Sequence, residues 1–327
     1  MDRSALLFGD LERIPEVLRT ISARRPWRRD LAGTREVILT GLGSSRFAAL
    51  VVEPVLREAG LTVIVEHASA SRPAPVAEGS LFVAISNSGS TPETVAAIER
   101  ARGAGALTLA ITNNPESPLA IAAEEVLALG AGAEDSGVAS ASYCATVAVL
   151  AQLAAAFGAG DPARSLLAAA EGIDSLLGSR DDWLQAAADC LDGGAAVHVL
   201  ADASALGTAE QAALLLRECP RLEADATDAG DWLHVGLYTA LPGYRAMLLA
   251  GTRYDAPVAD TIHGRGGRVL AIGPAVAFPA DAAVNLPASV DGDHVALALV
   301  ESAATTAIAA ELWRRTVGSP APGPHLG

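Results

Sequence analysis

Lysine is absent from this sequence of 327 residues: all 23 basic side chains are arginine, against 38 acidic ones, which gives a formal net charge of −15. Without lysine, no side chain can form a Schiff base with a carbonyl substrate or with pyridoxal phosphate. A P-loop lysine that reaches a nucleotide phosphate is missing as well, and so is the strand lysine of protein kinases. The composition therefore excludes three classes of chemistry before any motif is considered.

Cysteine is scarce, and long apolar runs are missing. The three cysteines, Cys144, Cys190 and Cys219, are widely separated and form no C-x-x-C pair, which predicts buried free thiols in a reducing compartment. The first residues lack the apolar core of a signal peptide, and no unbroken apolar run reaches the roughly 18 residues of a membrane span. The negative charge argues against nucleic acid and anionic membranes. We therefore expect a cytoplasmic protein with no nucleic-acid or membrane partner.

Short apolar runs alternate with helical segments along the chain, and 51% of the residues are hydrophobic. Because continuous apolar strands between helices indicate parallel sheets covered on both faces, the pattern predicts two α/β units. The predicted strands are 36–40, 61–65, 81–85, 106–111 and 125–129, then 196–200, 244–249, 269–272 and 283–286. The predicted helices are 4–29, 45–59, one from 92, 140–156, 162–191 with a linker-like 178–179, 206–219 and 295–316. We divide the chain into an N-terminal helix (1–30), a first unit (31–160), a helical linker (161–191), a second unit (192–317) and a proline-rich tail (318–327).

Two strand-to-helix turns of the first unit are rich in glycine and serine. They are Gly41-Leu-Gly-Ser-Ser-Arg46 and Ser86-Asn-Ser-Gly-Ser-Thr91. Both follow predicted parallel strands, so both lie at the carboxyl edge of the sheet, where open α/β folds bind ligands. Both also open a helix, whose first amides favour an anion. Hydroxyl and amide donors together suit a phosphate monoester without any cation, so we predict a phosphate site here.

Helix capping and dinucleotide binding are the alternatives to a phosphate site at these turns. Serine and threonine are ordinary helix N-caps, although one cap needs only one hydroxyl. The first turn also nearly matches the G-x-G-x-x-G dinucleotide motif, and Glu66 stands where a ribose-binding acid would be expected. However, Arg46 replaces the third glycine, and a dinucleotide site gives the second turn no role. NAD binding is therefore the less favoured hypothesis.

The two turns, together with Glu134-Asp-Ser-Gly-Val-Ala-Ser140, resemble sugar isomerase (SIS) domains. The similarity is greatest to the isomerase half of glucosamine-6-phosphate synthase, which has two tandem SIS units, and it covers roughly residues 30–317. It implies two flavodoxin-like, doubly wound units, each with a parallel five-stranded sheet flanked by helices. It also implies a hexose phosphate or amino-hexose phosphate as ligand. The residues implied at the phosphate are Ser44, Ser45, Ser86, Asn87, Ser88 and Thr91, with Val138 and Ser140 along the sugar.

The resemblance also implies two catalytic residues in the second unit. Glu218 ends a predicted helix and matches the family's enolisation base, while His234 matches its ring-opening histidine. Aldose–ketose interconversion moves a proton between C1 and C2, which a carboxylate can do through a cis-enediol. Ring opening needs a second acid or base, and a histidine titrates in the right range. The family further implies a homodimer in which His234 is contributed across the subunit boundary. As a simple alternative, Glu218 could be a solvated helix-end carboxylate and His234 a packing or capping imidazole.

Several departures from the synthase pattern limit the chemistry. Asp2 replaces the nucleophilic cysteine of the glutaminase domain, so we expect no glutamine hydrolysis. Gln211 and Leu215 stand where the family helix carries a glutamate and a lysine. The segment that resembles the family's C-terminal tail ends without the imine-forming lysine, which excludes a protein imine. His263, in a predicted loop, and His325, in the tail, have no assigned role.

These observations predict a phosphosugar-binding protein that needs no cofactor and no metal. The favoured activity is aldose–ketose isomerisation, or isomerisation with deamination of an amino-sugar phosphate, in which Glu218 is the base. The alternative is a non-catalytic sugar-phosphate sensor, or a paralogue of the synthase that has kept only the phosphate turns. The sequence does not specify which sugar phosphate is bound.

Overall fold

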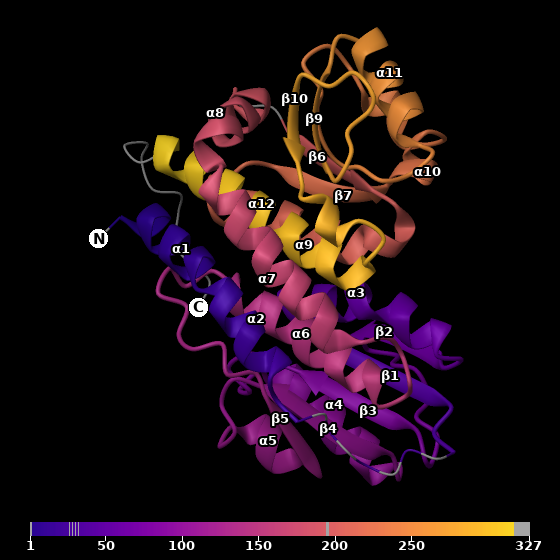
Figure 1. The fold of residues 1–327 in the computed structure, drawn as a ribbon. Coiled ribbons are helices and arrows are strands. Elements are labelled where there is room, and N and C mark those ends of the chain that lie inside the picture. Colours follow the sequence, from indigo (N-terminus) through magenta and orange to yellow (C-terminus); the bar gives the residue numbers. More distant parts are fainter. Residues whose placement is uncertain are drawn as a thin grey trace.

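Two α/β units lie at opposite ends of the molecule, with a layer of helices between them (Figure 1). The computed structural model describes residues 2–316 except 26, 28, 30, 32, 194 and 195. The proline-rich tail and His325 therefore lie outside the described residues. Within those residues, each unit contains one five-stranded sheet in which every neighbouring pair of strands is parallel.

The first unit has the strand order β2-β1-β3-β4-β5, the flavodoxin-like order that the resemblance implies. Its strands are β1 (Glu36–Gly41), β2 (Thr62–His67), β3 (Leu81–Ile85), β4 (Leu107–Thr112) and β5 (Glu125–Ala128). Its helices are α3 (Ser44–Glu58), α4 (Pro92–Gly103), α5 (Pro118–Ala122) and α6 (Ala141–Ala155). Two further helices, α1 (Arg3–Glu12) and α2 (Ile14–Ser22), precede this unit.

The second unit repeats this order, because its sheet runs β10-β9-β8-β6-β7. Its strands are β6 (Val197–Ala201), β7 (Ala224–Asp228), β8 (Arg245–Leu249), β9 (Arg268–Gly273) and β10 (Ala282–Asn285). Its helices are α9 (Leu206–Glu218), α10 (Ala229–Trp232), α11 (Asp255–Gly264) and α12 (His294–Thr316), with single 3₁₀ turns η1 (Ala203–Ala205), η2 (Gly236–Thr239) and η3 (Ala288–Val290). Helices α7 (Pro162–Gly178) and α8 (Arg180–Leu191) connect the two units. The tandem architecture predicted from the sequence is confirmed.

The largest hydrophobic core joins the inner faces of both sheets through the central helices. Side chains alternate across each strand, so Val37 and Leu39 of β1 face this core, whereas Ile38 faces a separate cluster beneath α4 and α5. The second sheet does the same, with Leu200 and Leu248 facing a smaller cluster beneath α10 and α11. The shared core keeps the two units in one fixed arrangement.

The predicted N-terminal helix over residues 4–29 is wrong in extent. The segment forms two helices, α1 and α2, separated at Arg13, and regular helix ends at Ser22. Pro15, in the first turn of α2, explains the break, because proline cannot donate the hydrogen bond that would continue α1. The predicted helix over 162–191 is likewise two helices, and it divides at Ser179, beside the linker-like Gly178.

Strand β7 and helix α11 are absent from the sequence-based prediction. Strand β7 has the sequence Ala-Asp-Ala-Thr-Asp and lies at the edge of its sheet, where polar side chains reach solvent. It therefore lacks the apolar run by which the other strands were recognised. Helix α11 begins with Asp-Ala-Pro, and only four of its residues are buried. Its apolar pattern is weak for that reason.

Helix α12 is long and apolar enough to cross a membrane by length and composition, although the sequence analysis found no such run. In the structure, 94% of its most apolar window is buried inside the protein. It passes between the two units and contributes to the largest core (Figure 1). The composition of α12 is therefore that of a central core helix.

Helices α3 and α9 bring the two units into close contact. A Cβ atom on Gly207 of α9 would lie 2.5 Å from the Phe47 carbonyl oxygen and 2.9 Å from Leu50 Cβ, both on α3. Only glycine permits this approach of the helix backbones. Arg46 of α3 and Glu210 of α9 form a long ion pair of 4.0 Å across the same contact. The first residues of α3, which form the end of the first serine-rich turn, are thus fixed against the second unit.

Candidate active site

The two serine-rich turns of the first unit lie on either side of a topological switch point. Strand β2 pairs with one edge of β1, and the next strand along the chain, β3, pairs with the opposite edge of β1. Neighbouring strands β1 and β3 pair with Thr40 opposite Ala84, so the turns after them begin side by side. A Cβ atom on Gly41 would lie 3.1 Å from the Ile85 carbonyl oxygen. Switch points of this kind are the usual ligand sites of open α/β sheets.

In the second turn, the hydroxyl groups contact one another instead of capping the helix. Thr91 is the N-cap of α4, yet its side chain makes no capping hydrogen bond. Its Oγ1 lies 3.0 Å from the Oγ of the buried Ser86, which also accepts from the Gly89 amide at 3.2 Å. Because one hydroxyl proton suffices for the Ser86–Thr91 bond, the other remains to donate elsewhere. Simple capping therefore does not explain these residues.

The remaining polar residues of this turn face solvent. Asn87 and Ser88 are exposed, and the Ser88 hydroxyl accepts from the Ser90 amide at 3.2 Å, which leaves its proton free to donate. Gly89 has a φ of +67°, and a Cβ atom there would lie 2.0 Å from Ser117 Oγ. Glycine is therefore required at this position, both for its backbone conformation and for space.

The first turn opens α3 without any side-chain cap. Its N-cap is Gly43, with φ 51° and ψ −130°, a conformation that residues with a Cβ atom rarely adopt. Ser44 and Ser45 are the first two residues of helix α3, and both are half-buried. The Arg46 side chain is only 14% exposed and faces Glu210 of α9. Arg46 therefore packs between the units, at the position where a dinucleotide site would have its third glycine.

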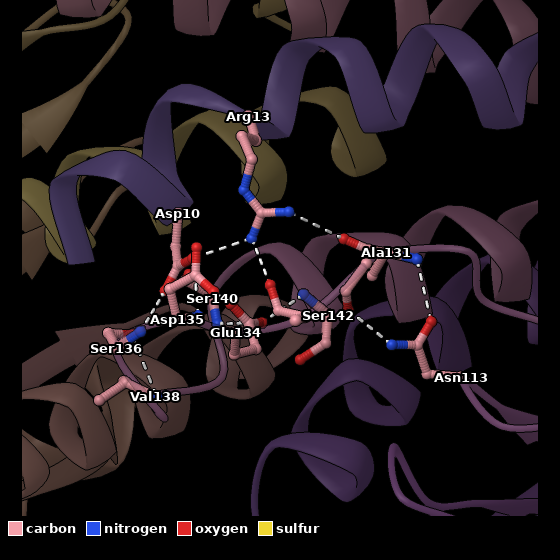
Figure 2. Close-up of polar contacts among 12 residues, drawn as sticks. Asp10, Arg13, Asn113, Ala131, Glu134, Asp135, Ser136, Val138, Ser140 and Ser142 are labelled. Atoms are coloured by element: carbon pink, nitrogen blue, oxygen red, sulfur yellow. Dashed lines mark hydrogen bonds and ion pairs between the residues drawn. The ribbon is translucent and has the colours of Figure 1, made fainter. Parts of the chain in front are cut away.

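The third segment of the resemblance, residues 134–140, is anchored by the N-terminal helices (Figure 2). The carboxylate of Asp10 accepts from the amides of Asp135 at 3.1 Å and Ser136 at 2.9 Å, and it pairs with Arg13 at 2.8 Å. Arg3 donates to the Ser136 carbonyl oxygen at 2.7 Å. Although burial acts in the opposite direction, the hydrogen bonds from Ser136 and Arg13 hold the pKa of Asp10 below its usual value.

A second carboxylate organises the other end of this segment. Glu134 accepts from the amides of Ser140 at 3.0 Å and Ser142 at 2.6 Å, and thus caps α6 (Figure 2). Val138 and Ser140 are 5% and 2% exposed, so both predicted sugar-lining residues are held close to the core. Glu134 belongs to the motif, but its capping role is not predictable from the motif alone. Asp10 was not among the predicted site residues; an acid on the apolar face of an amphipathic helix signals a buried carboxylate, but not which residues it contacts.

Gln211 reaches the same segment from the second unit. Its Nε2 donates to the Ala139 carbonyl oxygen at 2.9 Å, and its side chain is 1% exposed. Leu215, one turn later, is fully buried. The two positions at which the synthase family carries a glutamate and a lysine are thus packed into the protein here. Gln211 positions the 134–140 segment, and Leu215 belongs to the core.

Glu218, the predicted base, is half-buried at the C-terminal end of α9. Burial raises the pKa of its carboxyl above the usual value, and the nearby Arg221 and Arg217 only partly oppose that shift. Arg221 has a φ of +61° and is the one non-glycine residue with positive φ among the described residues. Such strained backbone is concentrated at functional sites. A carboxylate with a raised pKa beside a strained turn has the character of a general base.

His234 follows α10 and is exposed, and its amide donates to the Asp231 carbonyl oxygen at 2.9 Å. No hydrogen bond joins His234 to Glu218 among the described parts of the chain. The expectation that His263 lies in a loop is wrong: it lies in α11 and pairs with Asp281 at 2.9 Å. No role at this site is assigned to it. Within one chain, the structure thus brings together the two serine turns, whereas the catalytic assignment of His234 stays a prediction.

Comparison with known proteins identifies the first unit. Residues 30–157 match the model of the SIS domain family. Over 286 residues, or 82% of this chain, the sequence is 27% identical to glutamine–fructose-6-phosphate aminotransferase (isomerizing) 1 of Arabidopsis thaliana. That alignment covers 42% of the plant protein, so the chain spans about two fifths of the length of this curated relative.

Solved structures match both units together. The C-terminal domain of glucosamine-fructose-6-phosphate aminotransferase from Francisella tularensis superposes with a TM-score of 0.84, covering 98% of each chain at 17% identity. Tagatose-6-phosphate ketose/aldose isomerase from Escherichia coli superposes with a TM-score of 0.80, covering 98% of this chain and 96% of that one at 19% identity. At these identities the likeness establishes the fold.

The Asp10 anchor leads to a prediction about stability and its pH dependence. Asp10→Asn should lower the free energy of unfolding by about 1–3 kcal/mol at pH 7, because buried amides lose a charged acceptor. Since folding lowers the pKa of Asp10, this contribution is present above about pH 4 and is lost as the pH falls through the folded pKa. Urea unfolding at several pH values measures it.

The matched control for this experiment is the exposed Glu16→Gln on α2, which should change stability by less than about 0.5 kcal/mol. Equal stability of Asp10→Asn and the wild type at pH 7 would contradict the anchoring role. A difference that persists undiminished at pH 2.5 would contradict the electrostatic explanation.

Proposed function

This chain belongs to the SIS-domain proteins, and we propose that its first unit binds the phosphate of a hexose phosphate, which the protein isomerises. The observation that carries the proposal is the turn Ser86–Thr91. There Thr91 leaves α4 uncapped while its hydroxyl contacts Ser86. An uncapped helix N-terminus beside free hydroxyl protons is a site for an oxyanion, and it needs no lysine.

The phosphate would lie between the two turns, at the switch point of the sheet. Ser88 and Asn87 face solvent there and can donate to its oxygens, and Ser44 and Ser45 approach from the start of α3. The 86–91 turn contains no carboxylate that would repel a dianion. The sugar would then extend toward Val138 and Ser140, in the segment that Asp10, Glu134 and Gln211 hold in place.

Isomerisation requires a base that moves one proton between C1 and C2. Glu218 fills this role because its half-buried carboxylate has a raised pKa and therefore a stronger affinity for the proton that it removes. The base takes the C2 proton of the open-chain aldose, and the C1 carbonyl oxygen takes up a proton, so that a cis-enediol forms. The same carboxyl then returns its proton to C1 while the C2 hydroxyl loses its proton and becomes the ketone, which makes the net oxygen-bound transfer one proton from O2 to O1. When C2 of the sugar carries an amino group, the same shift gives an imine at C2, and water hydrolyses this imine to the ketone and ammonia. Deamination of an amino-sugar phosphate is therefore the related reaction.

Ring opening would use His234 of a second copy of the chain. His234 is exposed and is followed by three exposed apolar side chains, Val235, Tyr238 and Leu241, which are 59%, 74% and 66% exposed. An apolar group of this kind on one short segment favours a protein interface. A homodimer would cover these side chains and bring His234 to the site of its partner.

A non-catalytic sugar-phosphate sensor is the second candidate function. The observation that favours it is the burial of Gln211 and Leu215, which leaves Glu218 without the charged neighbours that the family helix carries. A sensor would keep the phosphate turns and lack proton exchange at the sugar carbon. Binding and exchange, measured on the same protein, therefore separate the two functions.

Phosphate binding is tested by ligand-induced thermal stabilisation with fructose 6-phosphate. At about 100-fold over its dissociation constant, the ligand should add roughly 2.7 kcal/mol to the stability of the wild type. Ser88→Ala should reduce this gain, whereas the exposed Ser71→Ala in the same unit should leave it unchanged. The proposal fails if neither fructose 6-phosphate nor glucosamine 6-phosphate stabilises the protein, or if unphosphorylated fructose does so equally well.

The role of Glu218 is tested in D₂O by exchange of the C2 proton of an aldose 6-phosphate, or of a C1 proton of fructose 6-phosphate. Glu218→Gln should slow exchange by about 10²- to 10⁴-fold, while phosphosugar binding persists. In the wild type, exchange should fall at low pH through an apparent pKa above the usual glutamate value of about 4.3, because the base must be ionised. Arg221→Gln removes a positive charge that lowers this pKa, so the acid limb should move to higher pH. Binding without exchange for every hexose and amino-hexose phosphate tried would establish the sensor.

If each active site of a homodimer uses Glu218 of one subunit and His234 of the other, two inactive variants should complement each other. Glu218→Gln and His234→Asn should each be inactive alone. After subunit exchange at equal amounts, half of the dimers are mixed and each contains one complete site, so roughly a quarter of the wild-type activity should return. A mixture that stays inactive although mixed dimers form, or a protein that is monomeric at working concentration, would contradict the shared site.

A further inference from the structure

The second unit contains a cavity at the position equivalent to the phosphate site of the first. Here too, the first strand, β6, pairs with β7 on one edge and with β8 on the other. The switch point of this sheet therefore lies between β6 and β8. A cavity of about 600 Å³ opens there. Its walls come from the turn after β6, the turn after β8 and the first two turns of α12. This volume is in the range of small-molecule sites.

The turns around this cavity are already occupied by carboxylates of the chain itself. Asp255 accepts from the amides of Gly251 at 2.7 Å and Thr252 at 3.0 Å, and from the Thr252 hydroxyl at 2.9 Å. Asp202 accepts from the amide of Ser204 at 2.9 Å and from its hydroxyl at 2.6 Å. These turn donors are therefore used internally, and the two carboxylates repel an anion beside them. The corresponding turn 86–91 of the first unit contains no carboxylate.

One further acid lines the cavity with no partner. Glu301 of α12 is 2% exposed, and its side chain forms part of the cavity wall. Among the described residues, none donates a hydrogen bond to its carboxyl group, and burial alone raises its pKa to about 8. A carboxyl group buried without a partner is costly, and a ligand that supplies the partner recovers that cost.

The two basic side chains of the cavity are engaged elsewhere. Arg253 is exposed and donates to the hydroxyl of the adjacent Tyr254 at 2.7 Å. His294 approaches the carbonyl oxygen of Val51 on α3 through its Nε2, at 2.8 Å. Neither supplies a positive charge to Glu301. Ser204 and Thr252 add hydroxyl groups at the wall of the cavity.

We propose that this cavity is a second ligand site, which binds a small organic cation with a primary ammonium group placed against Glu301. The ammonium would pair with that carboxylate, and the hydroxyl-lined part of the wall suits a polar, hydroxyl-bearing remainder. The two units thus use the same crevice for opposite charges, an anion in the first and a cation in the second. This site is independent of the function proposed above.

Calorimetric titration with unphosphorylated glucosamine and with 1,4-diaminobutane tests the proposal. At least one of the two amines should bind, and glucose, which lacks the ammonium, should bind at least tenfold more weakly than glucosamine. Glu301→Gln keeps the size of the side chain and should weaken amine binding at least tenfold. Ser88→Ala, at the phosphate turn of the first unit, should leave it unchanged, and fructose 6-phosphate should not compete.

A second variant keeps the test valid if Glu301→Gln does not fold. Ser204 is exposed and lines the cavity, so Ser204→Phe should block amine binding without disturbing the core. The proposal is overturned if neither amine binds, if glucose binds as tightly as glucosamine, or if both variants bind amines like the wild type. Loss of amine binding in Ser88→Ala would place the amine in the first unit and would also overturn it.

Discussion

The proposed function depends on which groups accept hydrogen bonds from the backbone amides at the two switch points. Both units have the same strand order, and in both the switch point lies between the first strand and the third. In the first unit, Gly43 and Thr91 start their helices without a side-chain cap. In the second unit, α9 and α11 also start without a side-chain cap, but Asp202 and Asp255 accept from amides of the turns before them. One architecture therefore gives turns that we propose bind an anion in the first unit, and turns that already contain carboxylates in the second.

The packing between the units explains how the open site is completed. The segment 134–140 belongs to the first unit, but α1 holds it from one side and α9 from the other through Asp10 and Gln211. Helix α9 approaches α3 closely because Gly207 has no side chain, and the same helix ends at Glu218. The proposed phosphate turns, the segment 134–140 and the proposed base are thus fixed by a single layer of helices. A sequence change in this layer would affect the site without touching a ligand.

Much of this arrangement could be predicted from the sequence. Buried parallel strands such as β3 are continuous apolar runs, and Pro92 with Glu93 marks the start of α4. Together with the motif residues, this was sufficient for the tandem fold and for the positions of both serine turns. Strand β7 escaped prediction because an edge strand needs little apolar surface. The anchors were missed for a different reason: Asp10 and Ser136 are 126 residues apart, and no local pattern connects them.

The absence of lysine excludes less chemistry at the proposed site than the composition alone suggests. The proposed phosphate site needs no cation, because hydroxyl groups and uncapped helix termini would act as its donors. Leu215 fills a core position where the synthase family has a charged side chain, so the substitution is accommodated by packing. An imine between sugar and protein stays impossible with this sequence, and proton transfer by Glu218 needs none.

A crystal structure of the complex with fructose 6-phosphate tests the central claim most directly. We expect density for the phosphate at the turn Ser86–Thr91, within hydrogen-bond distance of Ser88 and the first residues of α4. We also expect no phosphate at the turn Gly251–Asp255 of the second unit. Phosphate density at that second turn, with the first turn empty, would contradict the proposed site.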